Sequence, residues 1–274
     1  MFPEILKIGS ITIQTYGFLM ALGFISCYLL ATHLAKRTGR NPDEVQTITM
    51  TAAIAGVIGA RTVYVWQNWA TEFAKKTLDA FKIWEGGLVF YGGFLLATAA
   101  LLFYAYKKHE PLRSLTDYCA IFIPLGHAFG RVGCFFYGCC YGEICKDNAL
   151  AVSFPKGSPP WLHQVADHLI SPYASKSLPV FPIQLFEAAG CALLFVILWW
   201  TYLRFRHLRG LCSGIYCAGY ALLRFTIECF RNDPRGETYF GLTFSQTISV
   251  ALLVAAACLI FFALKGVKNG SVNR

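Results

Sequence analysis

Seven stretches of about 20 mostly apolar residues recur along the chain, and this spacing limits strongly what the chain can fold into. A helix of that length crosses the hydrocarbon core of a bilayer. The chain is 56% hydrophobic and 14% charged, whereas a soluble domain carries about 25% charged residues. The sequence therefore predicts an all-α integral membrane protein with seven transmembrane helices, at residues 12–34, 47–67, 86–106, 117–135, 183–203, 212–230 and 244–264.

The basic residues predict how these helices are oriented, because cytoplasmic loops are enriched in Lys and Arg. If the helices alternate, one side carries Lys36, Arg37, Arg40, Lys107, Lys108, Arg113, Arg204, Arg206, Arg209, Lys265, Lys268 and Arg274. We therefore expect the N-terminus outside and the C-terminus inside. The net charge of +9 follows from this topology, so it predicts no nucleic-acid partner. The long first apolar run and its basic flank indicate a retained helix rather than a cleaved signal peptide.

We expect one transmembrane domain over residues 1–274, with two segments outside the membrane. Residues 68–85 have the composition of a short amphipathic helix at the membrane interface. Residues 136–182 form a longer extracytoplasmic arm between the fourth and fifth helices. Long loops of this kind are usually either functional or disordered. The closely spaced glycines at its start and the sequence FPIQLFE at its end favour an ordered cap over the outer face.

Arg61, Arg131 and Arg224 lie inside apolar stretches at a similar depth. At ~1.5 Å per residue, each lies roughly 20 Å above the inner surface of a ~30 Å hydrocarbon core. An arginine there costs at least ~2.5–3.5 kcal/mol and normally faces a partner or a water-filled cavity. The obvious buried carboxylates are Glu187 and Glu228, so three cations face two anions. This shortfall predicts an anionic ligand within the membrane, and a lipid phosphate is the nearest candidate.

A purely structural ion-pair network is the alternative interpretation of these charges. In that network Glu228 holds Arg224 and Glu187 holds Arg61, which leaves Arg131 unpaired. The network also gives no reason for the glycines of the third stretch, which come as the pairs Gly86–Gly87 and Gly92–Gly93. Close helix packing explains such pairs, and so does a helix break or a backbone exposed to a ligand.

Helical spacing gathers further polar residues near the same depth. One helix carries a polar stripe at i, i+4, i+8 and i+11, formed by Tyr220, Arg224, Glu228 and Arg231. Another carries His127, Arg131 and Cys134 on one face. Tyr91 and Glu187 each lie roughly 8 Å below the outer surface. Five helices therefore place polar groups in one layer in the outer half of the bilayer.

Four of the eleven cysteines cluster at the outer end of the fourth helix: Cys134, Cys139, Cys140 and Cys145. Disulfides are permitted outside the membrane, so a disulfide in this group and free thiols both remain open. The vicinal pair does not match the usual two-residue spacing of zinc ligands, and we predict no metal and no cofactor. The other cysteines are interpreted as small apolar packing residues.

Ordered motifs along the whole chain resemble those of the prolipoprotein diacylglyceryl transferases. They are TYGFLMALGF, IGARTVYV, WEGGLVFYGG, GRVGCFFYGCCYGE, FPIQLFE and GYALLRFTIECFRNDP. The resemblance implies an enzyme of the bacterial plasma (inner) membrane that lipids enter laterally and whose site faces the outer leaflet. It would transfer the diacylglyceryl group of phosphatidylglycerol to the lipobox cysteine of a preprolipoprotein signal peptide and release glycerol phosphate.

The resemblance also implies roles for individual residues. Arg131 and Arg224 would hold the phosphate, and Tyr16, Gln184, Glu187 and Tyr220 would line the head-group pocket. Together with the depth argument, this predicts catalytic roles for Arg131, Arg224, Tyr91 and His127. It predicts substrate contacts for Tyr16, Arg61, Gly92, Cys134, Gln184, Glu187, Tyr220 and Glu228.

This chain departs from the family pattern at three positions. Members usually carry histidine where Tyr91 stands, asparagine where Cys134 stands, and often an acidic residue where Cys139 stands. Tyrosine is a poor base near neutral pH, so Tyr91 is better suited to donating a hydrogen bond. His127 is a second candidate base. We favour a third option, in which nearby arginines raise the thiolate fraction of the acceptor and no dedicated base is needed.

Three other functions remain compatible with the sequence. The departures favour, as the main alternative, a related phosphatidylglycerol-dependent transferase with a different acceptor. Intramembrane arginines also mark anion pathways, which would suit a transporter or lipid flippase. The cysteine cluster would suit a redox or metal-binding membrane protein.

Overall fold

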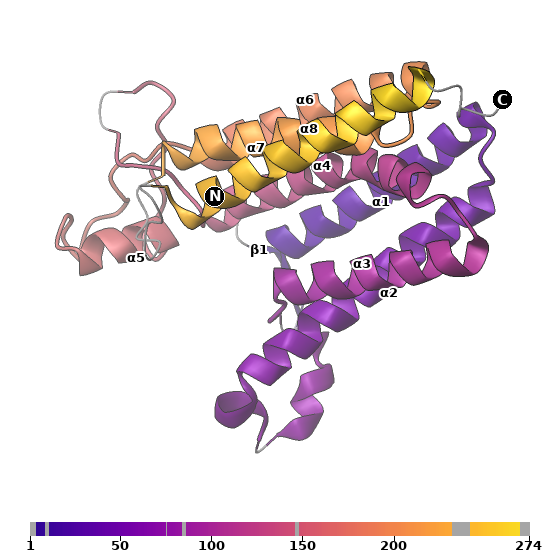
Figure 1. Ribbon diagram of the computed structural model, residues 1–274. Helices are drawn as coiled ribbons and strands as arrows, with labels where there is room; N and C mark the ends of the chain where they lie inside the picture. Colours follow the sequence, from indigo (N-terminus) through magenta and orange to yellow (C-terminus); the bar gives the residue numbers. More distant parts are fainter. Residues whose placement is uncertain are drawn as a thin grey trace. The chain divides into compact units, whose positions relative to one another are not determined.

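Long helices form at all of the predicted stretches. The computed structural model describes residues 4–8, 11–74, 76–83, 86–145, 148–231 and 242–268. Its long helices are α1 (Thr15–Thr38), α2 (Pro42–Gln67), α3 (Phe90–Lys108), α4 (Leu112–Tyr137), α6 (Ile183–Phe205), α7 (Leu211–Glu228) and α8 (Phe244–Lys268), drawn in Figure 1. A short antiparallel hairpin, β1 (Glu4–Ile8) and β2 (Ile11–Gln14), precedes α1. The first apolar stretch therefore begins as a strand and continues as a helix.

Five of the described helices are long and apolar enough to cross a membrane, namely α1, α2, α4, α6 and α8. The other two long helices are shorter, and each contains charge. Helix α3 has 19 residues and ends in Lys107 and Lys108. Helix α7 has 18 residues and includes Arg224 and Glu228. The helical membrane architecture is thus confirmed, and the number of spans stays a prediction.

The chain divides into two compact units. The larger unit comprises Met1–Cys27 and Thr116–Arg274, and the smaller unit comprises Tyr28–Leu115. One boundary falls within α1, after Cys27, and the other falls within α4, after Leu115.

Helices α2 and α3 form the smaller unit and approach each other through glycines. A Cβ atom on Gly92 would lie 2.4 Å from the carbonyl oxygen of Gly59, and one on Gly93 would lie 2.8 Å from that of Gly56. Only glycine permits such close backbones, so the second glycine pair is explained by packing. The predicted role of Gly92 in substrate binding stays a prediction.

The segment between α2 and α3 differs from the sequence-based expectation of one amphipathic helix over 68–85. It contains a π-helical turn η1 (Trp69–Phe73) and a 3₁₀ turn η2 (Thr77–Phe81) instead. The backbone at Lys76 has φ −139° and ψ 62°, which is not helical and separates the two turns. Phe73 is buried and packs edge-on against Tyr64, with ring centroids 6.1 Å apart.

Helices α4, α6, α7 and α8 make up most of the larger unit (Figure 1), whose buried residues include Tyr118, Ile121 and Leu198. Asp117, near the start of α4, accepts hydrogen bonds from the backbone nitrogens of Gly210 and Ser213 at 2.5 and 2.8 Å. These nitrogens belong to the first turn of α7, where backbone donors lack helical partners and favour a negative charge. Asp117 therefore fixes the start of the helix that carries Arg224.

The arm after α4 has defined elements and a buried core in the part that the structure describes. It contains helix α5 (Pro159–Ala166) and buries Phe154 and Val180. The side chain of Gln164 donates to the carbonyl of Leu178 and accepts from its backbone nitrogen. These bonds tie α5 to the end of the arm and hold it in a fixed conformation. Whether it covers an outer opening stays a prediction.

Candidate active site

Arg131, on α4, lies between a histidine and a carboxylate. Its Nε donates to Nε2 of His127, one turn below, at 3.0 Å, and lies 3.0 Å from Oε2 of Glu187 on α6. The Glu187 side chain is 1% exposed, so its charge is compensated by Arg131 rather than by water. The hydrogen bond and the ion pair that Arg131 forms with these described residues both use Nε. Its two terminal nitrogens take part in neither.

Arg224, on α7, has one occupied and one open terminal nitrogen. Its Nη2 lies 2.6 Å from Oε2 of Glu228 and donates to Oγ of Ser245 at 3.0 Å. Its Nη1 is buried and has no hydrogen-bond partner among the described residues. A buried guanidinium donor without an acceptor is costly, so this atom marks a place for an anionic or polar ligand.

These pairs correct the ion-pair network that the sequence suggested. Glu228 does hold Arg224, but Glu187 pairs with Arg131 and not with Arg61. The shortfall of carboxylates therefore does not leave Arg131 without a counter-charge. The buried Nη1 of Arg224, which has no hydrogen-bond partner among the described residues, is what now indicates an anionic ligand.

Other predicted residues of the larger unit surround these arginines. The ring of Tyr220 lies 5.2 Å from that of His127, and its hydroxyl is within electrostatic reach of both arginines. Gln184 is fully buried and donates to the carbonyl of Cys139 at 2.7 Å. Its Oε1 has no partner among the described residues. The site thus combines open donors with an open acceptor.

Tyr16 reaches the same unit from the start of α1. A Cβ atom on Gly133 would lie 2.9 Å from Cδ2 of Tyr16, so this glycine lets the ring pack closely against α4. Tyr16 is 40% exposed, which leaves its other face accessible.

Arg61, in the smaller unit, is satisfied by backbone carbonyls. It donates to the carbonyls of Asp79 and Ala80 at 2.7 and 2.8 Å, and to that of Gly86 at 2.6 Å. Gly86 and Gly87 have φ values of 88° and 71°, which favour glycine and turn the chain toward the guanidinium. The expectation that Arg61 needs an anionic partner is therefore wrong, and its predicted substrate contact stays a prediction.

Two further predicted residues, Tyr91 and Gly92, also belong to the smaller unit. Tyr91 is 65% exposed and stands at the start of α3. The structure therefore gathers Arg131, His127, Glu187, Tyr220 and Arg224 within the larger unit, and leaves the roles of these two as predictions.

Two hydroxyl groups that contact the charged residues of the site were not predicted from the sequence. Ser245 and Thr243 lie at the start of α8; the first accepts from Arg224, and the second donates to Oε1 of Glu228 at 3.1 Å. Serine and threonine are common at the starts of helices. Only the packing of α8 on α7 distinguishes these two from ordinary helix-end residues.

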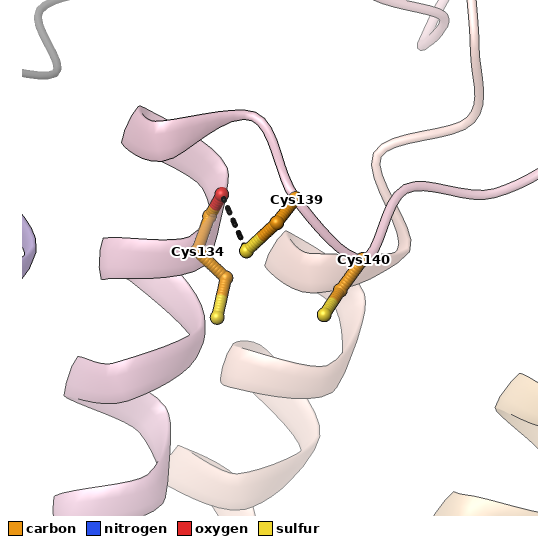
Figure 2. Close-up of side chains that lie close together, drawn as sticks. All are labelled: Cys134, Cys139 and Cys140. Carbon is orange, nitrogen blue, oxygen red and sulfur yellow. Dashed lines mark hydrogen bonds between the residues drawn. The ribbon is translucent and has the colours of Figure 1, made fainter. Parts of the chain in front are cut away.

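The structure records the eleven cysteines without disulfide bonds. Cys134, Cys139 and Cys140 come together, with sulfur atoms within 4.8 Å of one another (Figure 2). Hydrogen bonds from the thiols of Cys134 and Cys139 hold the pKa of the Cys140 thiol well below its ordinary value. Cys140 also adopts φ 58°, a left-handed conformation that is uncommon outside glycine. Cys145 lies outside this cluster.

The fold and the site define a multi-pass helical membrane protein with a buried cluster of arginines and carboxylates. The family model for prolipoprotein diacylglyceryl transferase matches residues 3–262, so the chain belongs to this family.

Named relatives are similar over nearly their whole length. The phosphatidylglycerol–prolipoprotein diacylglyceryl transferase of Paraburkholderia phymatum is 29% identical over 98% of this chain and 94% of its own. Those of Burkholderia thailandensis and Burkholderia multivorans are each 30% identical over 96% of this chain, and over 95% and 94% of their own.

Proposed function

We propose that this chain transfers the diacylglyceryl group of phosphatidylglycerol to the lipobox cysteine of a preprolipoprotein and releases glycerol phosphate. One observation carries the proposal: Nη1 of Arg224 is buried with no hydrogen-bond partner among the described residues. The hydrogen bond and the ion pair of Arg131 with those residues both use its Nε, which leaves its terminal nitrogens outside these two contacts. Guanidinium groups bind phosphate oxygens through paired hydrogen bonds and stay charged in a low-dielectric site. Family membership and the names of the relatives support the same activity.

The reaction is a displacement at the glyceryl carbon that carries the phosphate. The acceptor sulfur forms a carbon–sulfur bond while the carbon–oxygen bond to the phosphate breaks. Negative charge therefore builds up on the departing glycerol phosphate. Arg131 and Arg224 are placed to stabilise that charge, and one preorganised donor of this kind typically contributes ~2.7–4 kcal/mol.

The carboxylates have a positioning role in this scheme. Glu187 holds Nε of Arg131 and Glu228 holds Nη2 of Arg224, so each guanidinium is fixed on one side and free on the other. Both carboxylates are nearly fully buried, which keeps the arginines oriented before the lipid arrives. Such preorganisation means that little reorganisation is needed as the charge develops.

The acceptor reacts as its thiolate, which is the nucleophilic form of cysteine. Nε2 of His127 already accepts a hydrogen bond from Arg131, so this atom is not free to take the acceptor proton. The positive charge of two nearby guanidinium groups favours the thiolate directly. This arrangement supports a reaction without a dedicated histidine base.

The membrane topology forms part of the proposal. All seven long helices would span the bacterial inner membrane, with the N-terminus outside. Helices α3 and α7 would cross beside more apolar neighbours, since α3 packs on α2 and α7 on α6 and α8. Arg131 and Arg224 lie in the later turns of helices that would run outward, which suits chemistry in the outer leaflet.

The activity is tested by incubating the purified protein with phosphatidylglycerol and a lipobox peptide, then measuring the peptide mass. We expect a diacylglyceryl thioether and an equal amount of glycerol phosphate. A peptide with serine in place of the acceptor cysteine is the matched control and should stay unmodified. Absence of the thioether in a folded preparation contradicts the proposal, and lipid movement across vesicles without a covalent product favours a transporter.

A further inference from the structure

The three clustered thiols at the outer end of α4 have no part in the mechanism described above. Cys134 lies in the last turns of α4, and Cys139 and Cys140 lie on the segment that follows (Figure 2). The Cys139 thiol donates to the backbone carbonyl of Cys134 at 3.8 Å, and all three sulfurs lie within 4.8 Å of one another. Each of the three residues is half-buried.

The geometry of these sulfurs suits a tetrahedral thiophilic metal ion. Their mutual separations are within 4.8 Å. Zinc–sulfur bonds of ~2.3 Å in a tetrahedral site require sulfurs ~3.8 Å apart, so closing around an ion needs shifts of under about 1 Å. Cys140 has a left-handed backbone, with φ 58°, and its thiol and that of Cys139 both lie near the Cys134 thiol. Folding, rather than sequence spacing, creates the set of ligands.

Three protein ligands leave a fourth tetrahedral position open. Structural zinc sites normally use four protein ligands, whereas catalytic sites use three and keep one position for water or substrate. The three cysteines meet at the site already described. Cys134 follows Arg131 by one helical turn, a rise of ~4.5 Å, and Gln184 donates to the carbonyl of Cys139 at 2.7 Å. Within the described residues, no fourth metal-binding side chain joins the cluster.

We propose that Cys134, Cys139 and Cys140 bind a zinc-like divalent ion whose open position takes the acceptor cysteine of the prolipoprotein. This inference rests on the proposed function. Coordination releases the thiol proton to water and holds the acceptor sulfur as a metal-bound thiolate. That sulfur's electron pair then forms the bond to the glyceryl carbon, and the carbon–oxygen bond breaks with its electrons on the departing phosphate. No atom is oxidised or reduced.

This assignment removes a difficulty in the mechanism. A free thiol is mostly protonated near neutral pH, and the imidazole of His127 and the carboxylate of Glu187 are both engaged by Arg131. A metal-bound thiolate needs neither group as a base. The nucleophile would then be activated beside the guanidinium groups that stabilise the leaving phosphate.

The first test measures zinc retained by the reduced, detergent-purified protein after gel filtration in metal-free buffer. We expect one zinc per wild-type chain and at least a tenfold weaker retention in Cys134→Ser, Cys139→Ser and Cys140→Ser. Cys145→Ser is the matched control, since it removes a nearby thiol outside the cluster and should retain zinc like the wild type. Wild-type protein that binds no zinc, that retains it equally in all variants, or that carries a disulfide within the cluster overturns the site.

The second test uses cobalt-loaded wild-type protein, whose thiolate-to-metal absorption reports the number of sulfur ligands. A lipobox peptide should increase this absorption by about one third, as three sulfurs become four. The serine peptide should leave the spectrum unchanged. Identical spectra with both peptides overturn coordination of the acceptor.

Activity separates this inference from the proposed function. Chelated, metal-free protein should lose at least tenfold in lipid transfer, and zinc should restore it where magnesium does not. Full activity without metal overturns the inference and leaves the proposed function standing. Cluster-dependent zinc binding without any thioether product overturns the proposed function and the acceptor part of the inference with it.

Discussion

Arg61 and Arg224 occur in similar apolar stretches, yet the structure treats them differently. In the smaller unit, the guanidinium of Arg61 donates to carbonyls of the turn between α2 and α3. Its flat face also lies 5.4 Å from the rings of Tyr64 and Phe73. In the larger unit, Arg224 is held by Glu228 and Ser245 on one side, and its Nη1 has no described partner.

The difference separates a structural arginine from one prepared for a ligand. A guanidinium whose three nitrogens all donate to backbone carbonyls stabilises a turn. It has few hydrogen-bond donors left to bind a substrate. A guanidinium fixed by a buried carboxylate keeps its orientation and its charge, and it retains donors for an anion. Burial alone does not distinguish the two arginines, because both are largely buried. They differ in which guanidinium nitrogens have hydrogen-bond partners.

The largest expected effect on lipid transfer comes from replacing the two arginines of the larger unit, Arg131 and Arg224. Arg131→Ala and Arg224→Ala should abolish lipid transfer, because each loses stabilisation of the leaving phosphate. Arg224→Lys keeps the charge that pairs with Glu228 but loses the planar fork, and should lower kcat by about 10²–10³-fold. Steady-state transfer assays with folded protein check this. Normal turnover in both alanine variants contradicts the assignment.

Arg61→Met should show the opposite pattern, with a large loss of stability and a small loss of turnover. The variant leaves the carbonyls of Asp79, Ala80 and Gly86 without their donor, at about 1–3 kcal/mol for each that stays buried. Thermal unfolding in detergent measures the first effect, and transfer per folded molecule measures the second. An equally stable variant with greatly reduced turnover would place Arg61 with the substrate instead.

Gly92→Ala tests whether the smaller unit depends on close helix contact. The new methyl group would lie 2.4 Å from the carbonyl oxygen of Gly59, and overpacking of this kind costs about 1–3 kcal/mol. Gly56→Ala, on α2 of the same pair, is the matched control because its methyl group would meet nothing within 4 Å. Unfolding temperatures should fall for the first variant and stay level or rise for the second. Equal values refute the packing explanation.

Tyr91→Phe should have the smallest effect. If Tyr91 donates one hydrogen bond to the lipid, removing its hydroxyl costs about 0.5–1.5 kcal/mol, or roughly 3- to 10-fold in transfer rate. Stability should not change, since the side chain is 65% exposed. A loss comparable to that of the arginine variants would instead identify Tyr91 as an essential group.

The sequence predicts the helices well because bilayer thickness and apolar run length fix them almost independently of packing. The polar stripe through Tyr220, Arg224 and Glu228 is equally accessible, because α7 is regular up to Glu228. Which residues on different helices pair with each other cannot be predicted from the sequence in this way. Glu187 lies at a depth that suits either Arg61 or Arg131, and only the packing of α6 on α4 selects the second.

The proximity of the three clustered cysteines also could not be predicted from the sequence, although these residues are close together in the chain. Cys134 is separated from Cys139 by the end of a helix and by Gly138, which has φ 87°. The spacing of these residues matches no simple ligand motif, yet the turn brings their sulfurs together. Non-helical backbone between two residues decides whether they meet, and residue spacing does not report it.

The proposed roles of Arg131 and Arg224 require that the lipid phosphate binds at their guanidinium groups. An experimental structure with bound phosphatidylglycerol measures this without relying on activity. We expect phosphate oxygens about 2.7–2.9 Å from Nη1 of Arg224 and from a terminal nitrogen of Arg131, with both carboxylate pairs retained. A head group bound elsewhere, with those nitrogens still without a phosphate, would contradict it.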